Sequence, residues 1–565
     1  MRNFMVILVA AVVIALPFVF RRESHHDLWQ PGDPVLVIIS PHNEAIRYEF
    51  ARAFNRWHME HYGSAVRIDW RVIGGTTEIA RFLEGETQSV FRAWWTRGLN
   101  RPWPAGGTSA LTAHRFESDR EDLIAIREAL RSNDDPALFS IGVDLFFGGG
   151  EFDHSRTFAR GITAAPWPDG IPEHLIYLPD GTELIPERLS GETWRAEGFI
   201  GTAISAFGIV YNVDRLADLG VEQSPSQWSD LTDIRFHRQL GIADPTKSGS
   251  VAKAFEMMIH QQINLAVEAA GFSWETAFSE DNQHPDYLAA IQEGWLNGIN
   301  LVRLIGANAR FFTDSAGRVP IDVSTGNAAV GIAIDFFGRF QAESSRDPRT
   351  GRERMRYVTP IGGSSVSTDP ISLIRGAPNR EIAVRFIEFT ISEAGQSLWN
   401  QRIGTPGGPE RFTLRRLPIR RDFYPSADNP VLQAAFEARA PYNVDDLSDP
   451  SVNPYALAEQ FVYVADWTGR HFGIHRDLIR AMAMDAGDEL SAAWAAIARA
   501  GGPEAVPEAM EALFALPDGV SWEGLLDRDR FGPEHRMDYM REWVIFFRRQ
   551  YNLARRLAQQ GARDA

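Results

Sequence analysis

Val35-Leu-Val-Ile-Ile39 is an unbroken apolar run, and the polar turn Ser40-Pro-His-Asn43 follows it directly. A short apolar run of this kind predicts a buried strand of a parallel sheet. Apolar residues at helical spacing come next, at Ile46, Phe50, Phe54 and Trp57. The same order of strand, turn and helix recurs from Val66 through Gly74-Gly-Thr-Thr77 and beyond. This repeat predicts a doubly wound α/β lobe.

A second set of strands lies further along the chain. Residues 200–211 form a long apolar run rich in small residues, which we interpret as a connection between two lobes. Buried strands are predicted at 240–243, 329–334 and 355–359, and residues 370–374 are predicted to return to the first lobe. Beyond about residue 425 the pattern is mostly helical. The sequence therefore predicts two α/β lobes and a helical C-terminal region.

The expected organisation has five parts. Lobe one begins with residues 33–205 and carries an insertion at 86–136. Lobe two spans residues 206–368 and carries a helical insertion at 265–300. Residues 369–425 return to lobe one, and residues 426–565 form a helical C-terminal extension. Residues 1–22 form a separate N-terminal segment.

The N-terminal segment is apolar from residue 4 to residue 20, between Arg2 and the pair Arg21-Arg22. As a helix this run would be about 25 Å long, slightly less than the hydrocarbon core of a bilayer. It is long for the apolar part of a signal peptide, and no clear small-residue cleavage site follows it. We interpret it as an uncleaved membrane anchor, with a cleaved signal segment as the alternative.

Composition excludes several classes of protein. The chain has 565 residues and a formal net charge of −17, which argues against general nucleic-acid binding because that needs a basic face. It has no cysteine, so disulfides, cysteine-based metal sites and cysteine nucleophiles are excluded. The H-E-x-x-H and G-x-S-x-G motifs are also absent. We therefore expect no catalytic residues, no metal site and no cofactor.

Polar turns that follow the predicted strands are the candidate ligand contacts, because ligands of open α/β sheets bind beyond the carboxyl ends of the strands. Hydroxyls and free N–H groups at helix starts favour an anionic ligand. Each turn has plain helix capping, or a surface role for the carboxylate, as its alternative interpretation. The candidates are Ser40, Thr76, Ser248, Gly249, Ser250, Thr313, Ser315 and Asp335.

Several segments, taken in order, resemble the bacterial extracellular solute-binding proteins of ABC importers, in the branch of ferric-iron, 2-aminoethylphosphonate and sugar-phosphate binders. The resemblance covers about residues 35–425 apart from the two insertions. It is carried by Gly74-Gly-Thr-Thr-Glu78, Ala206-Phe-Gly-Ile-Val-Tyr-Asn212, Ala243-Asp-Pro-Thr-Lys-Ser-Gly-Ser250, Ala329-Val-Gly-Ile-Ala-Ile-Asp335, Asp369-Pro-Ile-Ser-Leu-Ile374 and Arg416-Leu-Pro-Ile-Arg420.

The resemblance implies a type II periplasmic-binding-protein fold, with two lobes that close around a solute by a hinge motion. It implies partners as well: an ABC permease and its ATPase, with the chain in the periplasm and held at the inner membrane by its N-terminal segment. One departure concerns the ligand. Phe336-Phe337 stands where ferric-iron binders have a tyrosine pair, and phenyl rings cannot ligate a metal. A phosphonate, phosphate ester or carboxylate therefore fits the Ser, Thr and Gly turns better than ferric ion.

Two other functions stay open at this point. A membrane-tethered ligand sensor or scaffold could use the same fold, with the helical C-terminal extension contacting a partner. A hydrolase in the cleft is the weaker alternative, since the sequence offers no nucleophile and base pair.

Overall fold

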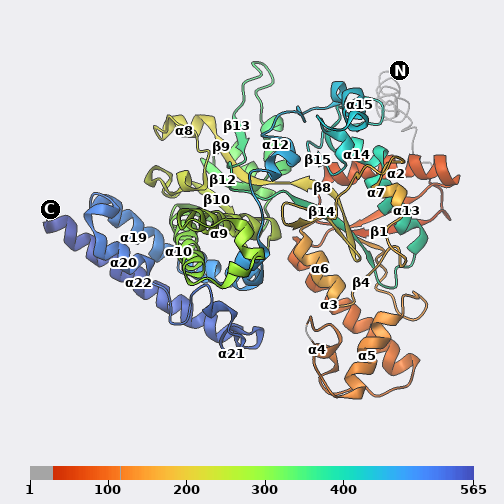
Figure 1. The fold of residues 1–565 in the computed structure, drawn as a ribbon, viewed down its shortest axis with the longest axis horizontal. Helices are drawn as coiled ribbons and strands as arrows, with labels where there is room; N and C mark the ends of the chain where they lie inside the picture. The colour runs from red at the N-terminus through yellow and green to blue at the C-terminus, as the bar shows by residue number, and fades with distance from the viewer. Residues whose placement is uncertain (1–28, 115, 565) are drawn as a thin grey trace, which may run out of the picture.

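The computed structural model describes residues 29–114 and 116–564. The predictions for residues 1–22 therefore lie outside the described residues. Two separate β-sheets organise the chain, one in each of two α/β lobes (Figure 1). Lobe one contains the sheet with strand order β15-β8-β14-β3-β1-β2, and lobe two the sheet with order β11-β10-β12-β9-β13.

The lobe-one sheet contains the apolar run that opens the predicted fold. β1 (Val35–Ile39) pairs in parallel with β2 (Arg67–Arg71) and with β3 (Leu145–Phe147). β14 (Ser367–Ile374) and β8 (Phe199–Ser205) extend the sheet in antiparallel fashion, and the short strands β4 (Thr163–Ala164), β7 (Arg195–Ala196) and β15 (Leu417–Pro418) join it at β14 and β8. The sheet is therefore mixed, because two of its strands enter from the connections to lobe two.

Helices cover both faces of this sheet, as a doubly wound lobe requires. Leu36 and Ile38 point into the core that holds α2 (Glu44–Tyr62), α13 (Arg380–Ile391) and α14 (Glu393–Asn400). Ile39 points the other way, into a core with Ile79 and Leu83 of α3 (Thr76–Ala93). α6 (Glu151–Ala159) packs beside α3. Alternate side chains of one strand thus fill two cores.

Lobe two is built on β9 (Phe207–Asn212), β10 (Leu240–Ala243), β11 (Ala309–Thr313), β12 (Val330–Ile334) and β13 (Met355–Val358). β10 lies parallel to β11 and β12, whereas β9 runs antiparallel to β12 and β13. Its helices are α8 (Val213–Asp218), α9 (Gly249–Ala269), α10 (Pro285–Ala307), α11 (Arg318–Ser324) and α12 (Asp335–Ser344).

Two short segments cross directly between the two sheets, and the C-terminal extension crosses a third time, between Asn443 beside Gln401 of lobe one and Val464 beside His260 of α9. Ala206 alone separates β8 in one sheet from β9 in the other, so residues 199–212 run from one sheet into the other. Residues 359–366 form the second crossing, between β13 and β14. Both of these crossings are short. They lie side by side, as the hydrogen bond from Phe207 N to Oγ of Ser364 shows. This arrangement suits a hinge.

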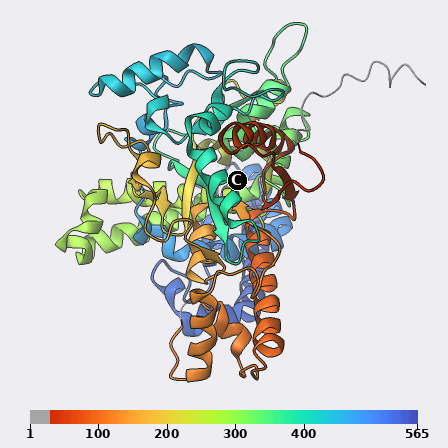
Figure 2. The same cartoon turned by 90° about the vertical axis from the view of Figure 1, so that its right-hand side faces the viewer.

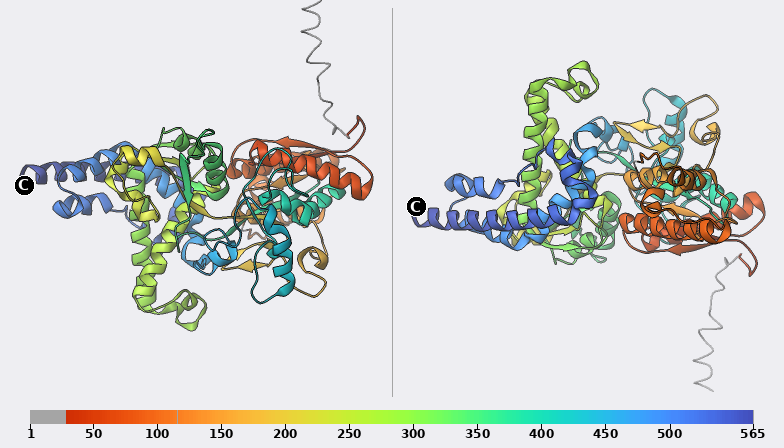
Figure 3. Two further views of the ribbon diagram at one scale, coloured as in Figure 1. Left: turned by 90° about the horizontal axis from the view of Figure 1, so that it is seen from above. Right: turned by 90° about the horizontal axis from the view of Figure 1, so that it is seen from below.

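The two predicted insertions are continuations of lobe helices. Residue 86 falls inside α3, which passes into a π-helical turn (Trp94–Gly98) and is followed by α4 (Gly107–Leu111) and α5 (Glu121–Ser132). These helices form the lower end of lobe one around a small core of their own, including Phe91, Trp95 and Ile126 (Figure 2). Residues 265 and 300 fall inside α9 and α10, which form a projecting hairpin (Figure 3). α3, α9 and α10 each run through the predicted boundary without a break.

The C-terminal extension is helical. Its helices are α15 (Pro430–Arg439), α16 (Pro454–Ala458), α17 (Ala465–Thr468), α18 (Phe472–Ile479), α19 (Gly487–Arg499), α20 (Pro507–Phe514), α21 (Arg528–Phe531) and α22 (Arg536–Asp564). α19 and α20 pack on α22, and this group covers α10 of lobe two (Figure 1). Trp494 donates to Oδ1 of Asn308, and the buried Arg303 donates to the Leu513 carbonyl. α19, α20 and α22 are therefore part of the folded body of lobe two, whereas α15 packs beside residues 421–423 of lobe one.

Short elements complete the chain: α7 (Glu173–Ile176), β5 (Arg188–Leu189) and β6 (Glu192–Thr193). Among residues 29–114 and 116–564, no helix is both long and apolar enough to cross a bilayer.

Candidate functional site

Two helix N-termini, one from each lobe, meet at the boundary between the lobes. α3 of lobe one begins at Thr76 after Gly75, and α9 of lobe two begins at Gly249 after Ser248. At Gly75 the approach is close enough to require glycine, whereas at Gly249 it is an ordinary van der Waals contact. A Cβ on Gly75 would lie 2.5 Å from the Lys247 carbonyl oxygen, and one on Gly249 would lie 3.9 Å from Thr76 Cβ. The lobes therefore touch where the sequence predicted facing amide-rich turns.

Four of the eight predicted contact residues gather at this boundary: Thr76, Ser248, Gly249 and Ser250. Thr76 is buried against Gly149, whose Cβ would come within 2.3 Å of Thr76 Cγ2. The Ser248 hydroxyl accepts a hydrogen bond from Val251 N at 3.4 Å, as a helix cap does. Ser250 is half-buried in the first turn of α9.

Ser40 lies at the end of β1 and is fully buried. Its hydroxyl accepts a hydrogen bond from His42 N at 3.1 Å, so the side chain stabilises the turn. Thr313 and Ser315 form a turn at the end of β11 in which Ser315 N donates to Thr313 Oγ1 at 3.0 Å. Asp314 between them pairs with Lys247 at 2.8 Å, which ties this turn to the start of α9.

Asp335, the last of the eight, starts α12 and is 1% exposed. Its Oδ1 accepts from Phe336 N at 2.8 Å, while Oδ2 has no hydrogen-bond partner among the described residues. Burial raises the pKa of this carboxyl, against the opposing effect of Arg339 and Arg416. Asp335 thus lies inside the molecule near the crossing segments and not on an outer surface.

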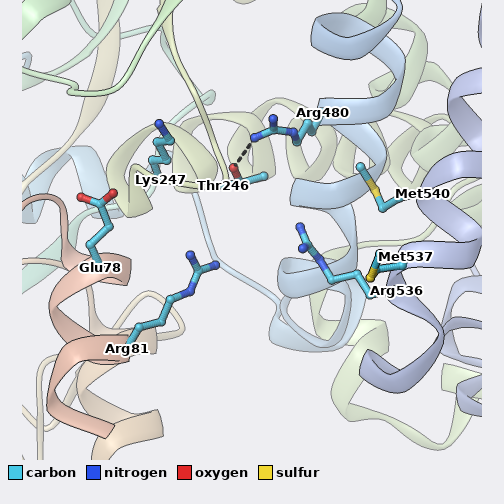
Figure 4. Close-up of a pocket in the computed structure, with 8 residues that line it drawn as sticks. All are labelled: Glu78, Arg81, Thr246, Lys247, Arg480, Arg536, Met537 and Met540. Atoms are coloured by element: carbon cyan, nitrogen blue, oxygen red, sulfur yellow. Dashed lines mark hydrogen bonds between the residues drawn. The ribbon is translucent and has the colours of Figure 1, made fainter. Parts of the chain in front are cut away.

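A cavity of about 490 Å³ opens beside the touching helix starts (Figure 4). We call it the cleft cavity. Glu78 and Arg81 of α3 line one side, and Thr246 and Lys247 of lobe two line the other. The remaining wall comes from the C-terminal extension: Arg480, Arg536, Met537 and Met540. None of the eight predicted contact side chains lines this cavity. Thr76 lies two positions before Glu78, and Ser248 directly follows Lys247, both of which do line it.

The side chains that line the cleft cavity carry more positive than negative charge, although Lys247, Arg480 and Arg536 each pair with an aspartate that does not line it. Four cationic side chains and the carboxylate of Glu78 line it. Glu78 accepts from Gly75 N at 3.2 Å, so it is engaged in capping its own helix. Lys247 pairs with the largely exposed Asp314, which raises the pKa of Lys247 by hydrogen bonding. A site of this kind favours an anion.

The extension contributes residues that sequence reasoning missed. Arg480 lies within hydrogen-bond distance of Asp244 Oδ2 at 3.1 Å and of Thr246 Oγ1 at 3.2 Å. Arg476, one helical turn earlier, donates to the Pro245 carbonyl at 2.7 Å. The spacing of these two arginines predicts a shared helix face, but no local signal says which surface that face contacts.

A buried ionic cluster lies next to the lobe boundary. His42 Nε2 is 2.8 Å from Asp369 Oδ2, and Arg416 contacts the same carboxylate while donating to Ser205 Oγ at 2.7 Å. Burial alone would raise the pKa of Asp369, but Arg416 and His42 hold it well below its ordinary value. Since Arg416 is fully buried, the cluster joins β14, β8 and the turn after β1 and is not open to a solute.

Metal chemistry has no candidate site in the described part of the chain, which contains no group of three or more His, Cys, Asp or Glu residues placed to hold an ion.

Comparison with known proteins gives one family match. Residues 179–423 match the model of the family described as bacterial extracellular solute-binding protein. An uncharacterized protein of Haemophilus influenzae is 27% identical over 199 residues, which is 35% of this chain. The match spans 46% of the length of that relative.

Similar solved structures include two that are described as periplasmic binding proteins. AfuA from Actinobacillus pleuropneumoniae, with exogenous fructose 6-phosphate bound, has a TM-score of 0.43 and 16% identity, over 73% of this chain and 98% of its own. The periplasmic binding protein P5PA has a TM-score of 0.43 and 15% identity, over 76% of this chain and 96% of its own. Iron-bound HitA from Pseudomonas aeruginosa has a TM-score of 0.36 and 14% identity, over 64% and 82%.

Proposed function

Since residues 179–423 match the family model described as bacterial extracellular solute-binding protein, we propose that the chain is the solute-binding component of an ABC importer. It captures a small anionic solute between its lobes and delivers it to the permease and its ATPase. It works in the periplasm, held at the inner membrane by its N-terminal segment.

The observation that carries this proposal is the cationic cleft cavity at the point where helix starts of the two lobes face each other. Helix N-termini present unpaired N–H groups and the positive end of the helix dipole. Arg81 and Lys247 add full positive charges, one from each lobe. A phosphonate, phosphate ester or carboxylate that bridges them would draw the lobes together.

Hinge closure accounts for capture without covalent chemistry. The lobes are joined at Ala206 and at residues 359–366, so a rotation about these short crossings opens or closes the space between α3 and α9. A solute that contacts both lobes binds the closed form more tightly and shifts the population toward it. In this proposal Thr76, Ser248, Gly249 and Ser250 contact the solute as the lobes move.

Ferric ion suits the site poorly. Phe336 stands where the resemblance places a tyrosine of the ferric-iron binders, and the centre of its ring lies 4.0 Å from the guanidinium carbon of Arg416. An apolar ring and a cation therefore occupy this position. Neither group is a hard oxygen ligand of the kind that ferric ion prefers.

A thermal-shift screen of the full-length chain tests the proposal. The panel contains phosphonates, sugar phosphates, carboxylates, polyols and ferric salts. An anion that binds only the native state at 100 times its Kd stabilises the protein by about 2.7 kcal/mol and raises the unfolding midpoint. The expected result is a rise with one anionic class and its loss in Lys247→Gln. Arg349→Gln is the matched control, because Arg349 is an exposed arginine in lobe two that does not line the cleft cavity. A rise with polyols or ferric salts alone contradicts the proposed solute class.

A further inference from the structure

A second concavity lies between lobe one and the C-terminal extension. Its volume is about 600 Å³, within the range of small-molecule sites. α3 and α6 form the lobe-one wall, while α18, α21 and the start of α22 form the opposite wall. We call it the arginine groove. Lobe one contributes Arg81, Arg156 and Arg160, and the extension contributes Arg470, Arg476, Arg528 and Arg536.

Carboxylates do not balance these arginines. Asp477 is the carboxylate that lines the groove, and it pairs with Arg536 at 2.6 Å. Arg160 pairs with Glu84, and Arg470 pairs with Asp466. Even with Glu84, Asp466 and the buried Asp153 behind the wall counted, seven cations face four carboxylates. This surplus stands out in a chain whose net charge is −17.

Three of the arginines have no side-chain partner. Within the described part of the chain, Arg81, Arg156 and Arg528 make no hydrogen bond and no ion pair through their guanidinium groups. Arg476 donates only to neutral oxygens, those of Thr77 and Pro245. Figure 4 shows Arg81 and Arg536 extending toward one another from α3 and α22. Donors on both walls are therefore available to one ligand.

The arginines of the groove also repel one another electrostatically. Arg476 is 7% exposed, and burial lowers its pKa. Asp153 opposes that change, whereas Arg81 and Arg156 add to it by repulsion. Apolar side chains lie among the charges, since Phe152, Leu525 and Phe531 also line the groove. A bound anion in such partly desolvated surroundings gains more than it would at an open surface.

We infer that the arginine groove binds a small molecule that carries two or more phosphate or carboxylate groups. One anionic group would contact the unpaired arginines of lobe one, and another would contact those of the extension. The groove is distinct from the cleft cavity, although Arg81, Thr246 and Arg536 border both. The inference does not depend on transport, because all seven arginines of the groove come from lobe one and the extension and none from lobe two.

Titration calorimetry of the full-length chain tests the inference. Inorganic pyrophosphate is the probe with two phosphate groups, and inorganic phosphate is the probe with one. Pyrophosphate is expected to bind at least tenfold more tightly than phosphate, and its affinity is expected to fall as salt rises. The double variant Arg156→Gln/Arg528→Gln is expected to lose at least tenfold in pyrophosphate affinity, and Arg349→Gln to lose none.

Two side chains that line the groove and not the cleft cavity make the outcome specific. Arg528 is exposed and makes no side-chain hydrogen bond or ion pair, so Arg528→Gln is expected to keep the wild-type unfolding midpoint. Arg156 is half-buried and helps to offset the charge of the buried Asp153, so the double variant is expected to have a lower unfolding midpoint. Arg528→Gln alone is the second variant, and it is expected to weaken pyrophosphate binding by a smaller factor. Unchanged affinity in both variants overturns the inference. A loss of pyrophosphate affinity in Lys247→Gln instead would place the bound anion in the cleft cavity. That result overturns the inference and leaves the proposed function standing.

Discussion

Arg476 on α18 donates a hydrogen bond of 2.8 Å to the Oγ1 atom of Thr77 on α3, across 399 positions of sequence. The same guanidinium donates from Nε to the Pro245 carbonyl of lobe two at 2.7 Å. One side chain of the C-terminal extension therefore contacts both lobes beside the touching starts of α3 and α9. The extension holds the present arrangement of the lobes, and any opening of the cleft has to break one of these two hydrogen bonds.

Replacement of this arginine should loosen the contact. Arg476→Gln is expected to lower the free energy of unfolding by about 2–4 kcal/mol, because it removes a buried charge-assisted donor and leaves Asp153 with less compensation. Arg476→Lys keeps the charge but not the two-sided donor geometry, so a smaller loss is expected. Urea unfolding of both variants measures the difference. A change below about 0.5 kcal/mol in Arg476→Gln would show that the contact adds little.

The chain has two lysines, and they should behave differently. Lys253 pairs with Glu192 at 3.0 Å and Glu256 at 3.1 Å and lies 3.7 Å from the centre of the Tyr463 ring. Burial alone would lower its pKa, but the two carboxylates raise the pKa well above its ordinary value. Lys253→Met leaves two buried carboxylates without their cation, so the expected loss of unfolding free energy is about 3–5 kcal/mol.

Lys247→Met is the control for that experiment. Its partner Asp314 is 82% exposed in the side chain, so a loss below about 1 kcal/mol is expected. Chemical denaturation of both variants checks the contrast. Equal losses would mean that Lys253 is not a central element of the join between α9 and the extension.

His154 gives the protein a pH dependence of known sign. Burial lowers its pKa to about 4, and the ring stacks on Phe146 with a hydrogen bond to Ser372. Between pH 6.5 and 4, His154 binds a proton in the unfolded chain but stays neutral in the folded chain. Stability is therefore fully present above about pH 6.5 and is lost as the pH falls through about 4.

At pH 5 the cost from His154 alone is about 2 kcal/mol, since one pKa unit corresponds to about 1.36 kcal/mol. Urea unfolding at pH 7 and pH 5 measures it. The drop in unfolding free energy between the two pH values is expected to shrink by about 2 kcal/mol in His154→Gln. An identical drop in wild type and variant would assign the acid sensitivity to other groups, such as His471, whose pKa burial also lowers to about 4.

Apolar runs and turn chemistry predicted much of the architecture. VLVII at 35–39 is β1, and the small-residue run at 200–211 does pass between the sheets. Thr76 and Gly249 lie together because both follow strands whose carboxyl ends face the lobe boundary. The order of strands in the mixed lobe-one sheet could not be predicted from local sequence patterns, since β14 and β8 pair across more than 160 positions.

The walls of the cavities could not be predicted in the same way. Arg476, Arg480 and Arg536 belong to helices that look like ordinary charged surface in the sequence, and only tertiary packing brings them to the lobe boundary. Ser40 and Asp335 show the converse. Both stand at strand ends as predicted, yet packing buries both side chains completely or nearly so. Local pattern identifies strand ends but not the long-range partners that cover them.

Modification of Lys247 tests the central claim, capture of an anion between the lobes, most directly. Lys247 borders the cleft cavity with 36% of its side chain exposed, whereas Lys253 is largely buried and ion-paired. Mass spectrometry can follow the rate at which an amine-reactive ester labels Lys247 in a panel of phosphonates, phosphate esters and carboxylates. The account predicts that one of these anions slows labelling in a saturable manner, with a midpoint equal to its Kd. An unchanged labelling rate across the whole panel, up to millimolar concentrations, would contradict it.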